Sequence, residues 1–224
     1  MDIEWIKSIK DIIGLVLVYV PSVTIAGALT ARRANRWGDS TAVDLGYGAF
    51  DPRMHVDPIG MMFLLIGPFG WGRTIPIDPF AIDIKRHDLK VLLVYLTGML
   101  VHVALMVASF CALVFVIGGV LLQNSPLYLA HESSLSMTLK FLLIKCFQFN
   151  FFYAVIACVR GLCDAALYLF HEELSGIPYL PLMAIFVPLI IVVLYAPALQ
   201  SVLMQLLVGV EYVLKYIVAQ WRGL

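Results

Sequence analysis

The sequence has few charged residues for its length. Asp, Glu, Lys and Arg make up 13% of its 224 residues, whereas an average soluble domain contains about 25%. Because 62% of the residues are hydrophobic, this composition excludes a soluble globular domain and predicts a helical integral membrane protein. The formal net charge is zero, so no nucleic-acid partner is predicted.

The sequence also lacks the residue pairs that usually bind structural zinc. None of its four cysteines belongs to a Cys-x-x-Cys pair, so we expect neither a structural zinc site nor a disulfide framework. The His-Glu pairs at 131–132 and 171–172 have no second histidine four residues after the first. Neither pair is therefore a zinc-protease motif.

Against this hydrophobic background, residues 38–79 are rich in Gly, Pro and Asp. Each proline removes a backbone donor, and each glycine loosens the chain. Non-helical backbone near a bilayer is stable only where protein or a polar cavity satisfies its hydrogen bonds. The stretch is therefore predicted to be an internal hairpin or re-entrant segment that the remaining helices enclose.

Within this stretch, three ordered blocks resemble the site-2 protease family of zinc intramembrane metalloproteases. They read Gly-Asp-x-Thr-Ala at 38–42, Asp-Pro-x-x-His-x-Asp-Pro-Ile-Gly at 51–60 and Gly-Trp-Gly-Arg-x-Ile-Pro-Ile-Asp-Pro at 70–79. In that family a His-Glu-x-x-His helix is followed by Gly-Asp-x-Thr-Ala, Asn-Pro-x-x-His-x-Asp-Pro-x-Gly and Gly-Trp-Ala-Lys-Pro-Val-Pro-Val-Asn-Pro. The motif positions retained here are Gly38, Asp39, Asp51, Pro52, His55, Asp57, Pro58, Gly60, Gly70, Trp71, Pro76, Asp78 and Pro79.

The zinc motif itself is absent. The family's spacing places Ala26 and Thr30 at the two histidines and Gly27 at the glutamate. Zinc hydrolysis needs two imidazoles on one helix face and a carboxylate that takes a proton from the bound water. The nearest counterpart of the third ligand is Asp164, which is spaced for an i, i+4 ion pair with Arg160. The resemblance therefore implies a scaffold without its metal, and no cofactor is predicted.

Hydrophobic runs predict five to six helices in a single membrane domain covering residues 1–224. The longer runs cover about 11–31, 91–122, 139–159, 179–195 and 198–219. A shorter patch, within residues 59–72, spans less than about 20 Å as a helix, so both a short crossing and a re-entrant path remain open. Small residues around Ala26 to Thr30 predict a close helix contact.

Four polar side chains fall within the predicted membrane helices: His102, Lys145, Asn150 and Glu211. Such residues are functional candidates by default, although hydrogen bonding between helices accounts for an Asn or a neutral His equally well. In the site-2 protease pattern, His102 and Asn150 both stand where the family has an Asn.

Together these features predict a catalytically inactive site-2 protease-like protein in a bacterial inner membrane. It would act as a scaffold, regulatory or accessory subunit, with membrane lipids and other membrane subunits as its partners. One alternative is an active zinc protease that uses His55, His102 and Asp164. The other is a conduit for protons or a small solute along the four intramembrane polar residues.

Overall fold

The computed structural model describes residues 9–66, 70–123 and 134–170, together with isolated positions between 190 and 220. The regular secondary structure of this part of the chain is helical, apart from a single isolated bridge. Three of its helices contain a stretch long and apolar enough to cross a membrane: Ile9–Arg36, Thr97–Val116 and Ser134–Leu169. The all-helical class is thus confirmed for the described residues, and three of their helices are candidates to cross a membrane. The expected helices at 179–195 and 198–219 lie outside the continuously described residues, so the count of five to six stays a prediction.

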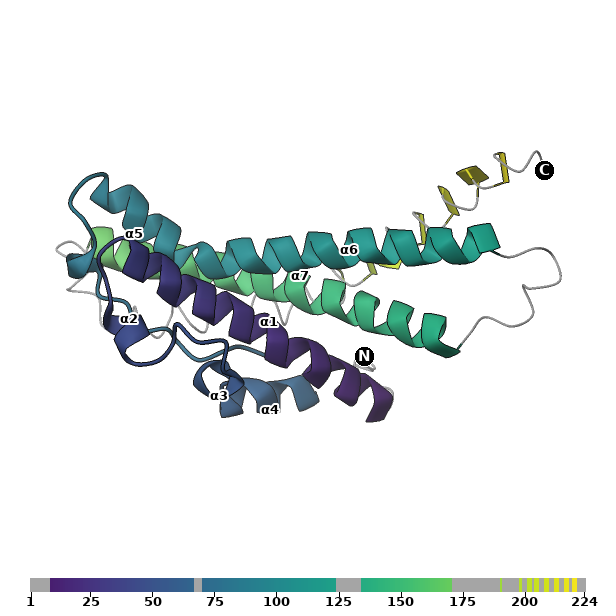
Figure 1. The fold of residues 1–224 in the computed structure, drawn as a ribbon, viewed down its shortest axis with the longest axis horizontal. Coiled ribbons are helices and arrows are strands. Elements are labelled where there is room, and N and C mark those ends of the chain that lie inside the picture. Colours follow the sequence, from purple (N-terminus) through teal and green to yellow (C-terminus); the bar gives the residue numbers. More distant parts are fainter. Residues whose placement is uncertain are drawn as a thin grey trace.

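The three long helices α1 (Ile9–Arg36), α6 (Thr97–Gln123) and α7 (Ser134–Leu169) lie side by side (Figure 1). Small residues bring them close together. A Cβ on Gly14 of α1 would lie 2.6 Å from the Phe141 ring of α7, and one on Gly161 of α7 would lie 2.6 Å from the carbonyl oxygen of Tyr95, just before α6 begins. With contacts this short, a larger side chain would fit only if the neighbouring atoms moved. Close backbone approach is the main source of helix packing energy in lipid.

The helix boundaries differ from the hydrophobic runs. α1 continues past the apolar run to Arg36, because basic residues are favourable at a helix C-terminus. The run at 91–122 is divided into α5 (His87–Tyr95) and α6, with Leu96 between them. At this break the Thr97 hydroxyl donates to the Leu93 carbonyl at 2.7 Å, a contact that often bends helices.

Between α1 and α5, the described residues form four short helices, and three of these begin at Asp-Pro dipeptides. They are α2 (Thr41–Asp44), α3 (Pro52–His55), α4 (Pro58–Ile66) and the 3-10 helix η1 (Pro79–Ala81). Asp51 and Asp78 accept from backbone N–H groups at the starts of α3 and η1, and Asp57 does the same for α4. Each aspartate caps its helix, and the following proline suits the first helical position. The repeated Asp-Pro of the motif thus has a structural reason.

The chain returns on itself around α4. Val56 and Gly72 form an antiparallel bridge, and the Arg73 N–H donates to the His55 carbonyl at 2.8 Å. The nine residues of α4 span only about 14 Å at 1.5 Å per residue, roughly half of a hydrocarbon core. A Cβ on Gly60 would collide with the Trp71 carbonyl oxygen. Glycine at this position therefore lets the outgoing and returning arms pack together.

Candidate functional site

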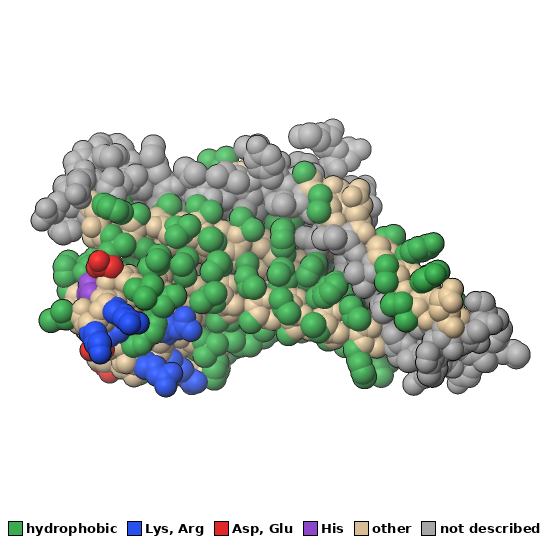
Figure 2. All heavy atoms as spheres, turned by 90° about the horizontal axis from the view of Figure 1, so that it is seen from above, with side chains coloured by type: hydrophobic (Ala, Val, Ile, Leu, Met, Phe, Trp, Pro, Cys, Tyr) green, Lys and Arg blue, Asp and Glu red, His purple; other side chains and the backbone are tan. Residues whose placement is uncertain are grey.

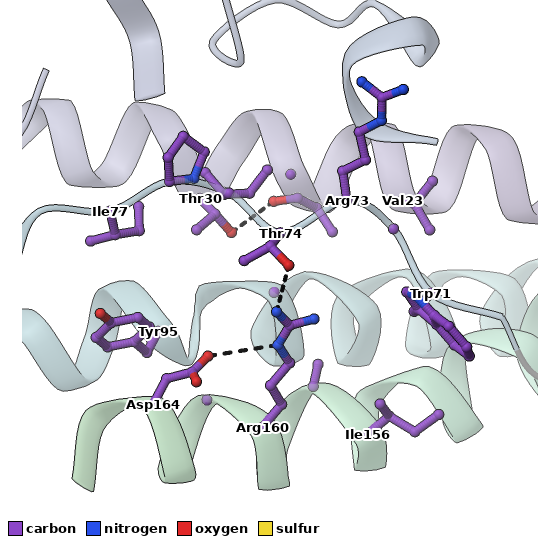
Figure 3. A pocket seen from close by; sticks show the side chains of 18 of the residues that line it. Val23, Thr30, Trp71, Arg73, Thr74, Ile77, Tyr95, Ile156, Arg160 and Asp164 are labelled. Carbon is purple, nitrogen blue, oxygen red and sulfur yellow. Dashed lines mark hydrogen bonds and ion pairs between the residues drawn. The ribbon is translucent and has the colours of Figure 1, made fainter. Parts of the chain in front are cut away.

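A cavity of about 580 Å³ lies between α1, the extended segment 71–77 and α7 (Figure 3). Ala26, Gly27 and Thr30 line it from α1, while Arg160 and Asp164 line it from α7. The positions that align with the family's zinc motif and third ligand therefore face one cavity. The spacing of the family's motifs identified these positions in the sequence, and the packing of α1 against α7 brings them to the same cavity.

The residues of this cavity do not fit a zinc ion. Ala26 offers a methyl group, and the Thr30 hydroxyl donates back to the Ala26 carbonyl at 2.8 Å. Among the residues that the structure describes, no group of three His, Cys, Asp or Glu side chains could hold a metal. His55, His102 and Asp164 are thus not gathered into a ligand set in this structure.

His55 is packed against Gly27, the position of the family's glutamate. A Cβ on Gly27 would collide with the His55 Nδ1, and the imidazole is only 1% exposed. The His55 Nε2 lies 3.0 Å from the Ala49 carbonyl oxygen. Because a carbonyl can only accept, Nε2 carries the proton and Nδ1 presents a bare lone pair toward α1. The loop histidine therefore occupies the space that a side chain at position 27 would need.

We expect His55 to make the protein less stable in mild acid. Burial lowers the pKa of His55, while the Ala49 hydrogen bond and the nearby Asp51 charge partly oppose that shift. An unfolded chain binds this proton near pH 6.5, but the folded chain binds it only at lower pH. The contribution of neutral His55 to folding stability is therefore fully present above about pH 6.5, and it decreases as the pH drops toward the pKa of the folded state.

The measurement is the melting temperature in detergent between about pH 7.5 and 5, for the wild type and for His55→Gln. A glutamine amide can still donate to the Ala49 carbonyl but does not titrate, so the acid-side decline should be smaller in the variant. Equal declines in both proteins would contradict the assignment.

His102 and Asn150 form a buried hydrogen bond between α6 and α7. The His102 Nδ1 lies 2.7 Å from the Asn150 Oδ1, and the Asn150 amide nitrogen donates to Ser22 Oγ on α1 and to the Cys146 carbonyl. Since the amide oxygen accepts, His102 Nδ1 is the donor. The His102 Nε2 is left as an acceptor with no partner among the described residues. His102 also lines the cavity.

The other polar residues in the helices are separate from this pair. Lys145 forms an ion pair with Asp11 at 2.7 Å, and Asp11 precedes Ser22 by eleven positions along α1, or about 16 Å at 1.5 Å per residue. Glu211 lies outside the described residues. The described part of the chain does not join the four residues into one path, so a conduit role stays a prediction.

Arg160 connects α7 to the extended segment. Its Nε lies 3.6 Å from the Asp164 carboxylate, which is the predicted i, i+4 pair, and its Nη2 donates to Thr74 Oγ1 at 2.6 Å (Figure 3). Asp164 is therefore engaged by a cation. The contact with Thr74 spans 86 positions, so no local pattern in the sequence could have predicted it.

Two tyrosines from the long helices satisfy backbone groups of the loop, and sequence reasoning missed both. The Tyr19 hydroxyl donates to the Trp71 carbonyl at 2.7 Å and accepts from the Asp57 N–H at 3.2 Å. The Tyr153 hydroxyl accepts from the Gly72 N–H at 2.6 Å. The available signal was the tyrosine itself, because a buried hydroxyl usually has a hydrogen-bond partner.

Asp39 links the first loop block to the third. It is fully buried, and its two carboxylate oxygens accept from the Thr41 N–H at 3.0 Å and the Asp78 N–H at 2.9 Å. With the two tyrosines, this carboxylate satisfies backbone groups of the loop that have no partner within a helix. The Gly, Pro and Asp of the motif therefore hold the loop in place beside the cavity.

The described part of the chain is helical, with three helices that are candidates to cross a membrane, and its Gly-, Pro- and Asp-rich loop packs beside the cavity. Comparison with known proteins adds a partial match to the protein called "Putative zinc metalloprotease YwhC" from Bacillus subtilis (strain 168), 36% identical over 64 residues. The match covers 29% of this chain and 29% of that relative, less than a third of its length. No family model and no solved structure matches the chain.

Proposed function

We propose that this chain is a catalytically inactive site-2 protease-like protein that acts as a scaffold, regulatory or accessory subunit of a larger membrane complex. The observation that carries this proposal is the packing of His55 against Gly27 beside Ala26 and Thr30. A zinc hydrolase needs imidazoles and a general base at these positions. Here they are occupied by a methyl group, a hydroxyl that bonds its own helix and a glycine covered by the loop.

The cavity wall offers a place for a partner to bind. The segment 73–77 is extended, and within the described part of the chain the backbone groups of Thr74, Ile75 and Ile77 form no hydrogen bonds. Unpaired extended backbone is a site at which another chain can add a strand. The ordered Arg160 side chain lies beside it and holds Thr74. The partner would thus bind to the outer edge of a preformed segment.

The proposed setting is a bacterial inner membrane, with α4 as a re-entrant helix. Ile59, Met61 and Met62 are exposed on α4, and exposed apolar side chains are favourable when they face lipid. The antiparallel pairing of Val56 with Gly72 supports a path that enters and leaves on the same side. The bacterial source of the partial match supports the location.

The test is site-specific photocrosslinking in membranes of the source cell, followed by purification in mild detergent. A photoreactive residue at Ile75 should yield a stoichiometric crosslinked partner. The matched control is Phe115, an 82% exposed side chain on α6, which should give lipid adducts only. A lone monomer without crosslinks at Ile75 would count against the subunit role.

Zinc analysis separates this proposal from the active-protease alternative. We expect the purified protein to contain substoichiometric zinc, and a chelator should leave its melting temperature unchanged, because no ligand set is gathered in the described residues. Elemental analysis and thermal unfolding measure both. One tightly bound zinc per chain that disappears in His102→Ala would support the alternative instead.

A further inference from the structure

A second hollow, of about 710 Å³, lies between the end of α1 and the first turns of α6. It combines cationic and apolar lining residues. The cationic side is formed by Arg32, Arg33 and Arg36, and the apolar side includes Leu100, Val101 and Ala104. We call this hollow the arginine groove. It is separate from the cavity described above, and its interpretation does not depend on the proposed function.

The three arginines of the groove have no acidic partner among the described residues, where the ion pairs involve other side chains. Arg32 and Arg36 are spaced i, i+4, and Arg33 and Arg36 are spaced i, i+3. Like charges at these spacings repel. The dipole of α1 offsets only part of this, because a helix C-terminus is equivalent to about half a negative charge. An anion in the groove would relieve the remaining repulsion.

Neutral contacts hold two of the guanidinium groups in position. The Arg32 Nε donates to the Gly48 carbonyl at 2.7 Å, and its guanidinium lies 4.3 Å from the Phe50 ring centroid. The Arg33 guanidinium lies 5.7 Å from the ring centroid of Trp37. These contacts order the side chains without neutralising them. Binding of an anion would therefore cost less arginine side-chain entropy.

The groove lies at one end of the membrane-length helices α1 and α6, where such helices would meet a membrane surface. α1 ends at Arg36, and the membrane-length part of α6 begins at Thr97. Trp37 lines the groove, and tryptophan is enriched at this depth. Figure 2 shows Lys and Arg gathered at one end of the molecule, next to an extended hydrophobic surface. Leu100, Val101 and Ala104 continue from the arginines along α6.

We propose that the arginine groove binds one anionic phospholipid. Its phosphate is held by Arg33 and Arg36 through paired N–H donors, which suit phosphate geometry. One acyl chain lies along Leu100, Val101 and Ala104. The combination of a cationic end and an apolar floor fits a lipid, because a free phosphate would leave the floor uncovered.

The test uses the full chain in nanodiscs of phosphatidylglycerol or phosphatidylcholine, with retained lipid counted by native mass spectrometry. The wild type should retain one phosphatidylglycerol in preference to phosphatidylcholine. Arg33→Gln/Arg36→Gln should weaken that retention about fivefold per arginine. Arg32 stays unchanged because it bonds Gly48. The matched control is Lys85→Gln, an exposed cation outside the groove, which should behave as the wild type.

Three results would overturn the proposal. The first is equal phosphatidylglycerol retention by the double variant and the wild type. The second is an equal loss in Lys85→Gln, which would indicate general surface charge. The third is a rise in melting temperature with inorganic phosphate alone that equals the rise with phosphatidylglycerol. That result would indicate that the groove binds a free anion rather than a lipid. Should the double variant fail to fold, the single variant Arg36→Gln decides, because its own retention of phosphatidylglycerol must fall about fivefold.

Discussion

Gly27→Ala should lower the melting temperature in detergent by about 2–12 °C. A Cβ at this position would collide with the His55 imidazole, and overpacking of this kind costs about 1–3 kcal/mol, with each kcal/mol worth about 2–4 °C for a chain of this size. Thermal unfolding followed by intrinsic fluorescence measures the effect. The consequence for the site is direct, since a glutamate introduced at position 27 would meet the same ring.

The matched control for this prediction is Gly98→Ala. Gly98 also lies in a long helix, but no atom would lie within 4 Å of an added Cβ. Alanine is the better helix former by about 1 kcal/mol, so the melting temperature should stay the same or rise. Combining Gly27→Ala with His55→Ala should cost less than the sum of the two single changes, because the collision is removed. Additive losses would show that the two residues do not touch.

The second large effect is expected for Asp39→Ala, at about 4 kcal/mol. The buried carboxylate accepts from the N–H groups of Thr41 and Asp78, and an unpaired buried donor costs about 1–3 kcal/mol. Its loss should also release the third loop block from the first. The measurements are thermal unfolding and limited proteolysis across residues 38–79, where new cleavage should appear.

Asp44→Ala is the control for this change. Asp44 lies a few residues further along, is exposed and accepts a hydrogen bond from the Ser40 hydroxyl. Exposed substitutions usually stay within about 0.5 kcal/mol, so neither the melting temperature nor the cleavage pattern should change. Asp39→Asn should fall between the two, because an amide retains only one acceptor oxygen. If Asp39→Ala behaved like Asp44→Ala, the assigned link between the blocks would be wrong.

The predictions from sequence were most accurate for features that depend on residues close together in the chain. Hydrophobic run length predicted the three membrane-length helices, and the i, i+4 spacing predicted the Arg160–Asp164 pair. The predictions were less accurate at helix ends. The break at Leu96 sits inside an unbroken apolar run, and hydrophobicity carries no signal for it. The Asp-Pro starts of α3 and η1 were recognisable helix-capping signals, but the Gly- and Pro-rich composition of residues 38–79 led us to expect non-helical backbone there.

By itself, the sequence determined that the chain is apolar, helical and suited to a membrane. It also determined that positions 26, 27 and 30 carry no imidazole or carboxylate. These follow from composition and residue identity, which do not depend on packing. Only the tertiary structure decided that His55 covers Gly27, that His102 meets Asn150, and that Tyr19 and Tyr153 hold the loop. Such contacts join residues distant in sequence, and their partners are set by how the helices pack, which no local pattern encodes.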